Sequence, residues 1–427
     1  MVMKRSGVVA VGLTMLCSGL QGCGSSPDDP VDKTDQQLEV FNWWTAPGET
    51  DALAALLKVY AQRYPQTEVV NAAVPTYSKA QETLRSRMES GDAPDTFQTL
   101  GGWGLLKWVA YNGVDDVDSK LEPIDSIAQQ NNLASVVPKA LMDNVSFSGK
   151  VYAVPLGVHR YNTLFFNKKL FDDSGLSPPT TLDEFYTVSE ALKGKGVIPL
   201  AVGGKDGHQI KTHTWDGLLI AKGGVQFRES YLSGHEDPAD PRIVDMLNEY
   251  AHMLEYSNAD RDALTWDAAA QLVVDGKAAM TVVGDFGKGF FLSKGWHAGI
   301  ELGEVPLPGT SGTFVYIVDS FGLPRGIPHR QATVNFLNLI STPEAQGVFG
   351  PLKGASAPRK DVDRSAYDSI AKSTMDDLAK DTLTRATNLM VQNSDFITAL
   401  NEAMRQFAVD RNVEAVINVL KNRYDLL

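Results

Sequence analysis

Side chains suited to binding a polar ligand fall where two apolar runs of the chain end. Trp43 and Trp44 close the first run, Glu49 follows in the next loop, and Gln98 closes a later run. Aromatic faces pack on weakly apolar C–H surfaces, whereas carboxylates and amides exchange hydrogen bonds with hydroxyl groups. Neighbouring strand residues point to opposite faces, so one Trp can face a ligand while the other packs in the core. These residues predict noncovalent binding of a small hydroxyl-bearing molecule.

Further candidates follow later in the chain. Asp285 comes after a glycine at the end of an apolar run, where its carboxylate could accept hydrogen bonds. Trp266 precedes an expected helix, Trp215 lies in a polar segment, and His159 follows an extended run. Large aromatic side chains and isolated histidines also serve as packing residues. We count all four as candidate ligand contacts.

Other roles remain open for several of these residues. Both tryptophans could pack in the core, and Glu49 could be a solvated loop acid or a charge at a helix N-terminus. Asp285 could cap the helix that follows it. Glu49 and Asp285 could also form the acid–base pair of a glycoside hydrolase or lyase.

No motif of an enzyme or metal site accompanies these candidates. The chain's two cysteines, Cys17 and Cys23, lie near its start, so the folded body lacks thiolates for zinc, an iron–sulfur cluster or a disulfide. No nucleophile elbow, phosphate loop or His-rich motif occurs. The net charge of −13, without a basic run among aromatics, argues against nucleic-acid binding. We expect a binding protein without enzyme activity, metal or cofactor.

The elements that must position these residues alternate between strands and helices. Apolar runs predict strands at 38–44, 68–74 and 95–98, and helical spacing predicts helices over 51–63 and 77–90. The β-α-β-α-β order predicts a parallel sheet covered by helices, with a ligand beyond the carboxyl ends of the strands. The candidates named first lie at those ends.

A second series of elements starts near Val151. The length of 427 residues is sufficient for two lobes, and we expect an α/β fold throughout. The predicted elements are an extended run at 151–166, helices over 181–192, 268–275 and 331–340, strands at 197–201 and 278–283, and helices after about residue 365.

The first 37 residues have the pattern of an exported lipoprotein. Lys4 and Arg5 precede a short apolar run, 8–16, which is too short to span a bilayer stably. The segment 20–23, Leu-Gln-Gly-Cys, resembles a bacterial lipobox, which implies a signal peptide over 1–22 and lipidation of Cys23. Residues 23–37 then form a polar tether. A conventional secretory signal or an uncleaved anchor remains the alternative.

Several ordered segments resemble the extracellular sugar-binding proteins of ABC importers, the solute-binding protein family 1 that includes maltose- and glucose-binding proteins. The glucose/mannose-binding branch is the most similar, because of the paired Trp and the late segment 353–356. The segments that carry the resemblance are Phe41–Thr45 with Gly48 and Glu49, Gly91–Gln98, Tyr152–Leu156 leading to Leu164–Lys168, Pro178–Phe185, and Gly276–Met280 before Gly284–Phe286.

The resemblance implies a two-lobed periplasmic-binding-protein fold with a hinged ligand cleft between the lobes. The first lobe would comprise 38–153 plus 284–322, and the second 154–283 plus 323–427. We place the crossings near 154–158, 280–283 and 321–325. The resemblance also places the paired Trp, Glu49 and the basic Lys353 at the sugar, although Lys353 could be an ordinary exposed lysine.

The same resemblance implies partners and location. A mono- or small oligosaccharide would be bound by lobe closure and passed to the permease subunits of an ABC importer. We expect a monomer, anchored through Cys23 in the periplasm or at the cell surface. A sugar-sensing lipoprotein that signals to a receptor is the main alternative, and a peptide or polyamine ligand is a further one.

Three departures from the glucose-binding pattern put glucose itself in doubt. Val283 stands where an amide is expected, two residues before the Asp, and neither Thr99 nor Leu100 supplies an expected cation. A C-terminal histidine of that branch is replaced near Asn388. These changes leave a sugar as the expected ligand without naming it.

Overall fold

The computed structural model describes residues 36–110, 119–205 and 207–427. The expected signal peptide, lipidated Cys23 and nearly all of the tether lie outside these ranges. Within them, no helix combines the length and apolar character needed to cross a bilayer.

The first lobe is built on a seven-stranded sheet in which β1 pairs in parallel with β2 and β3. The expected β-α-β-α-β opening is confirmed, with helices α1 (Glu49–Arg63) and α2 (Tyr77–Ser90) between these strands. Gly91 ends α2 in a left-handed conformation, at φ 79°. The strands of the sheet are β1 (Gln37–Asn42), β2 (Glu68–Ala73), β3 (Thr96–Leu100), β4 (Leu121–Glu122), β7 (Ala153–Arg160), β12 (Thr313–Pro324) and β13 (Thr382–Arg385).

Helices from two distant parts of the chain cover this sheet. The buried face of α1, including Leu53, Leu56 and Tyr60, belongs to the apolar core of the lobe. Helix α1 packs against α15 (Pro343–Lys353), and α14 (Arg330–Ile340) packs on β12. Helix α3 (Trp103–Val109) follows β3. The C-terminal portion of the chain therefore contributes to the lobe that its N-terminal portion begins.

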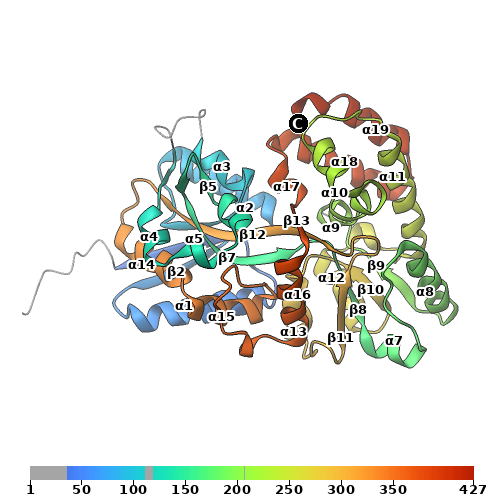
Figure 1. Ribbon diagram of the computed structural model, residues 1–427, viewed down its shortest axis with the longest axis horizontal. Helices are drawn as coiled ribbons and strands as arrows, with labels where there is room; N and C mark the ends of the chain where they lie inside the picture. Colours follow the sequence, from blue (N-terminus) through green and yellow to red (C-terminus); the bar gives the residue numbers. More distant parts are fainter. Residues whose placement is uncertain (1–35, 111–118, 206) are drawn as a thin grey trace, which may run out of the picture. The chain divides into compact units, whose positions relative to one another are not determined.

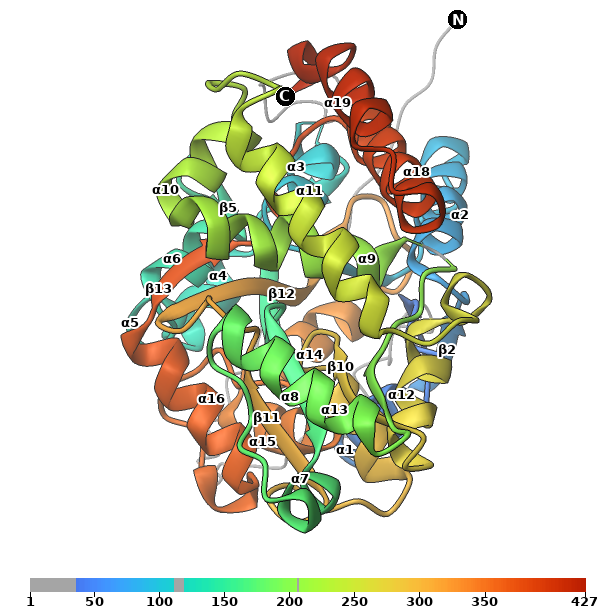
Figure 2. The same ribbon diagram turned by 90° about the vertical axis from the view of Figure 1, so that its right-hand side faces the viewer.

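The second lobe has a four-stranded sheet with the order β11-β8-β10-β9. Its helix α8 (Leu182–Gly194) lies where a helix over 181–192 was predicted, and it begins at a capping box formed by Thr181 and Glu184. Figure 2 faces this lobe, with α8 in front of the strands. Its elements include β8 (Thr163–Asn167), β9 (Ile198–Ala201), β10 (Ala278–Val282), β11 (Leu302–Pro306), α9 (His208–His213), α10 (Leu219–Leu232), α11 (Pro241–Met253), α12 (Trp266–Val274), α13 (Gly287–Ser293), α18 (Ser394–Asp410) and α19 (Val413–Lys421).

The lobe crossings differ from the sequence-based expectation. Residues 154–158 lie inside β7, which pairs with β12 in the large sheet (Figure 1), and 321–324 lie inside β12 itself. Residues 280–282 lie inside β10 of the small sheet. Strand β7 continues past Pro155 and Gly157, but its pairing with β12 shifts register between these two residues. Gly157 leaves room for Ala355 and Phe349.

The strand pairings place the crossings at three other points. The chain passes from β7 to β8 near residues 160–163, from β11 to β12 over 307–312, and from β13 to α18 after residue 385. Strand β11, expected in the first lobe, pairs with β8, whereas α14 and α15 pack on the first core. We therefore propose that, of the described residues, the first lobe comprises 36–110, 119–160 and 313–385, and the second 161–205, 207–312 and 386–427.

Candidate functional site

The paired tryptophans separate at the end of β1. Trp44 is 1% exposed and packs against Phe321 and Phe349 in the first core. Its backbone N–H donates to the side chain of Asn42. Trp43 is only half-buried and packs edge-on against Tyr77. Of the pair, Trp43 is therefore the side chain available to a ligand.

Trp43 belongs to an apolar cluster between the lobes, which we call the interlobe cluster. Phe286, after β10, also packs on it, and Trp266 lies edge-on to Phe286 with ring centroids 5.4 Å apart. The cluster thus joins aromatic side chains from both sheets. Its buried members are Leu100, Tyr161, Ile220, Val315, Ile317, Ala386 and Leu389, with Trp43, Val225 and Phe286 packed against them.

A fully buried imidazole lies beside this cluster. His159 Nδ1 lies 2.5 Å from Asp285 Oδ1, and His159 Nε2 lies 3.1 Å from Asp319 Oδ2. Burial and nearby Lys353 oppose a charge on the ring, but the hydrogen-bonded carboxylates still raise the pKa of His159. Burial alone would raise the pKa of Asp319, yet the bond and charge of His159 hold it below its ordinary value. These directions favour an imidazolium between two carboxylates.

Three of the predicted ligand residues belong to this network: His159 bonds directly to Asp285, and Asp319 links His159 to Gln98. Gln98 donates from Nε2 to Asp319 Oδ1 at 2.9 Å, and its Oε1 accepts the backbone N–H of Trp43 at 3.2 Å. Asp285 Oδ2 accepts the backbone N–H of Arg160 at 2.9 Å. Gln98, His159 and Asp285 therefore position Trp43 and the nearby backbone. Asp285 makes no capping bond to α13, so the helix-cap alternative does not apply.

Glu49, which is partly buried, forms an ion pair with the buried Lys353. Glu49 is the first residue of α1, and its Oε1 lies 3.2 Å from Lys353 Nζ. Lys353 is 2% exposed, and its ammonium lies 5.7 Å from the ring centre of Trp44 and 5.3 Å from that of Phe286. Lys353 is thus not an ordinary exposed lysine. The pair fixes charges at the edge of the interlobe cluster.

Trp215 lies elsewhere. It is fully buried in the core of the second lobe, stacked at 5.7 Å on Tyr231, and its carbonyl accepts a hydrogen bond from Arg228. Trp215 lies in a helical turn that packs on α10 and α11, which directs its ring into that core. Its role is packing, which was the plainer alternative.

Two residues at the lobe interface that the sequence did not single out, Lys211 and Tyr161, both bond to Asn388. Lys211 of α9 is buried and donates to Asn388 Oδ1 at 2.6 Å. Tyr161, at the first crossing, hydrogen-bonds to Asn388, and burial raises the pKa of its phenol. Lys211 supplies a buried cation, but from α9 of the second lobe and not from the segment at Thr99 and Leu100. The start of α9 gave no clear periodic signal, so Lys211 could not be placed from sequence.

A family model described as bacterial extracellular solute-binding protein matches residues 46–347. The chain belongs to this family. The resemblance noted from the sequence is therefore confirmed, and the two-lobed architecture agrees with it.

Relatives and solved structures extend the match beyond that segment. An uncharacterised ABC transporter extracellular-binding protein of Pyrococcus horikoshii is 34% identical, over 98% of this chain and 95% of that protein. A probable sugar-binding periplasmic protein of Rhizobium meliloti is 26% identical, over 81% of each chain. The bacterial solute receptor AcbH shares the fold with a TM-score of 0.80 at 19% identity, over 92% of this chain and 98% of that one.

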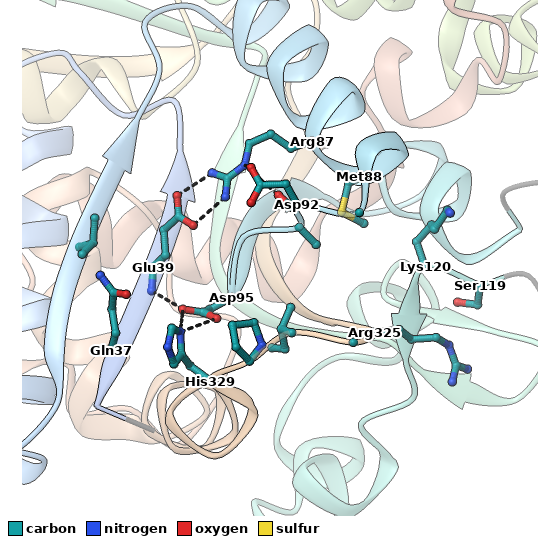
Figure 3. Close-up of a pocket in the computed structure, with 16 residues that line it drawn as sticks. Gln37, Glu39, Arg87, Met88, Asp92, Asp95, Ser119, Lys120, Arg325 and His329 are labelled. Atoms are coloured by element: carbon teal, nitrogen blue, oxygen red, sulfur yellow. Dashed lines mark hydrogen bonds and ion pairs between the residues drawn. The ribbon is translucent and has the colours of Figure 1, made fainter. Parts of the chain in front are cut away.

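The solute-binding protein has a cavity of about 900 Å³ at the N-terminal ends of β1 and β3 (Figure 3). Its polar side chains bond to each other there. The guanidinium of Arg87 donates two hydrogen bonds, of 2.6 and 2.8 Å, to the carboxylate of Glu39. His329 Nδ1 lies 3.0 Å from the carboxylate of Asp95. The cavity therefore lies away from the carboxyl ends of the strands, where the family fold would bind its solute.

Two observations concern the metal and acid–base alternatives in the described ranges of this solute-binding protein. No group of three or more His, Cys, Asp or Glu residues there is arranged to hold a metal ion. Glu49 pairs with Lys353, and Asp285 pairs with His159. Both carboxylates that could have formed an acid–base pair are thus bound within the protein.

Proposed function

We propose that this protein is a lipid-anchored receptor outside the cytoplasmic membrane, without catalytic activity. It would close around a mono- or small oligosaccharide and deliver that sugar to an ABC importer. The supporting observation is Trp43, a half-buried indole whose backbone is fixed by a network that includes residues of both lobes.

The chemistry of the interlobe cluster suits a sugar. Trp43, Phe286 and Trp266 offer aromatic surfaces for C–H faces. Lys211 and Asn388 offer a donor and an amide for hydroxyl groups. Ligand contacts made with both lobes would stabilise the closed form over the open one. Relatives that are named for ABC transport and for sugar binding support the same proposal.

A thermal-shift panel of mono- and disaccharides tests the ligand class. A sugar that binds only the folded protein raises the unfolding midpoint in a concentration-dependent manner. Failure of every sugar to shift the midpoint would contradict the proposal. Release of new reducing ends from oligosaccharides would indicate an enzyme instead.

Two further measurements test the anchor and the partner. Radiolabelled palmitate should enter the full chain in cells but not the Cys23→Ala variant. Vesicles containing the cognate permease and ATPase should accumulate the identified sugar only when this protein is present. Unaided uptake, or signalling without uptake, would favour a sensing role.

A further inference from the structure

The segment before α2 holds a backbone conformation that its sequence does not favour. Thr76 has φ 68° and ψ 141°. Positive φ is rare for β-branched residues, and strained backbones are concentrated at functional sites. Asn132 and Arg411 also have positive φ, but with ψ of 33° and 22° they lie in the ordinary left-handed helical region. Thr76 has no such ordinary explanation.

Helix capping does not account for the conformation of Thr76. Threonine stabilises a helix start when its hydroxyl accepts a backbone N–H. The Thr76 side chain makes no such bond, and its carbonyl accepts Ala80 N–H at 3.1 Å. The side chain of Thr76 is exposed, so core packing does not impose the conformation either. Its effect is to set the direction in which the next residue, Tyr77, leaves the backbone.

Tyr77 is directed towards the proposed site. β1 and β2 pair in parallel with Asn42 opposite Ala73, so the loops after both strands leave the sheet at the same edge. The rings of Tyr77 and Trp43 lie 5.1 Å apart at 89°. Tyr77 is 37% exposed, and among the residues the structure describes it is the one aromatic side chain in the set of exposed large apolar residues. Tyr77 is also near enough to Tyr161, at the first crossing, to contribute to the raised pKa of the Tyr161 phenol.

We propose that Tyr77 is a ligand-contacting, specificity-determining residue of the sugar site, and that Thr76 is the positioning residue that directs it. This inference depends on the proposed function. The perpendicular rings form a corner, in which a pyranose packed on Trp43 meets the edge of the Tyr77 ring and its hydroxyl group. Preorganising this corner lowers the entropy lost on binding.

The test uses the mature protein and the sugar with the largest thermal shift in the panel. Tyr77→Ala should weaken affinity about tenfold, and Tyr77→Phe separates the ring from the hydroxyl. Thr76→Gly should raise the unfolding midpoint, because glycine relieves the strain, yet weaken binding several-fold. Ser148→Gly is the matched control. It replaces another residue with positive φ, 47°, in the hairpin of β5 (Ser146–Phe147) and β6 (Lys150–Val151), and should leave affinity unchanged.

The outcomes separate the two claims. Sugar binding by the wild type together with unchanged affinity in Tyr77→Ala would overturn this inference while leaving the proposed function in place. Unchanged affinity in Thr76→Gly alone would overturn the positioning role of Thr76. Absence of sugar binding by the wild type would overturn both claims.

Discussion

Asp285 and His159 connect the two lobes through a 2.5 Å contact between Oδ1 and Nδ1. Asp285 follows β10 of the small sheet, whereas His159 belongs to β7 of the large sheet. Asp319 holds the other ring nitrogen, and Gln98 extends the chain of bonds to the backbone of Trp43. The half-buried indole of Trp43 is thus connected to the crossing between the lobes.

Replacing His159 by Gln should destabilise the protein by about 3–5 kcal/mol, because two carboxylates would stay buried without their cation. Urea unfolding at pH 6 measures this. His297→Gln is the control, because His297 forms a 3.1 Å pair with Glu301 while 70% exposed, and such pairs contribute at most about 1 kcal/mol. Equal effects of the two substitutions would contradict the role of the network.

The raised pKa of His159 also predicts how the stability of the protein depends on pH. When the pKa of a group is higher in the folded than in the unfolded state, the group stabilises the folded protein fully at pH values below its unfolded-state pKa. This contribution is lost as the pH rises through the folded-state pKa. Wild-type stability should therefore fall as pH rises above about 6.5, the ordinary histidine pKa. The His159→Gln variant should lack this decline. A decline of equal size in the variant would show that another group causes it.

Glu304 of β11 should produce a second pH dependence at lower pH. Burial raises the pKa of Glu304 to about 7, partly offset by Arg160, with Asp285, Lys288 and Thr374 also nearby. The folded protein then binds a proton that the unfolded chain releases, so the free energy of unfolding should fall by about 3 kcal/mol between pH 4.5 and 7. Urea titrations across this range should show the decline in wild type and in the exposed-acid control Glu414→Gln. A Glu304→Gln variant that keeps it would contradict the assignment.

The two adjacent tryptophans should give opposite phenotypes. Trp44→Ala removes a buried indole between Phe321 and Phe349 and should cost about 3–5 kcal/mol of stability. Trp43→Ala should cost much less stability but weaken binding of the identified sugar at least tenfold. Denaturant unfolding and calorimetric titration measure the two effects. Unweakened sugar binding by Trp43→Ala would remove Trp43 from the site.

A close backbone approach between the lobes should be sensitive to one added methyl group. Gly289 of α13 lies against the first lobe, where an added Cβ would come within 2.8 Å of the Leu352 carbonyl oxygen and 3.4 Å of Gly48 Cα. Gly289→Ala should hold the lobes apart and weaken ligand affinity. Small-angle scattering with saturating sugar should then show a larger radius of gyration than wild type. Gly194→Ala is the control, because nothing lies within 4 Å of its added Cβ.

Local patterns predicted the first lobe's opening well. The helix over 77–90 was predicted with its observed bounds, because apolar spacing and the Gly91 stop are local signals. The crossings were misplaced because they depend on which strands pair. β7 pairs with β12, whose partner residues lie more than 150 positions away, and no local pattern encodes that choice.

The sequence predicted which residues come together at the candidate site better than it predicted what each of them does there. Gln98, His159 and Asp285 lie in one network, but each forms its hydrogen bonds with other groups of the protein. Strand ends can be located from sequence, whereas the partner of a buried side chain cannot. The sequence does not single out Tyr77, because it opens a helix whose sequence looks ordinary. Its ring contact with Trp43, its exposure and the φ of Thr76 distinguish it only in the structure.

The number of lobe crossings has a practical consequence. Three is an odd number, so the described chain begins in one lobe, at β1, and ends in the other, after α19. Two fluorophores attached near residues 37 and 427 would therefore sit on different lobes, which we propose to close around the sugar. Energy transfer between them would report ligand-driven motion without a label inside either core. Neither lobe, however, can be expressed as one uninterrupted fragment.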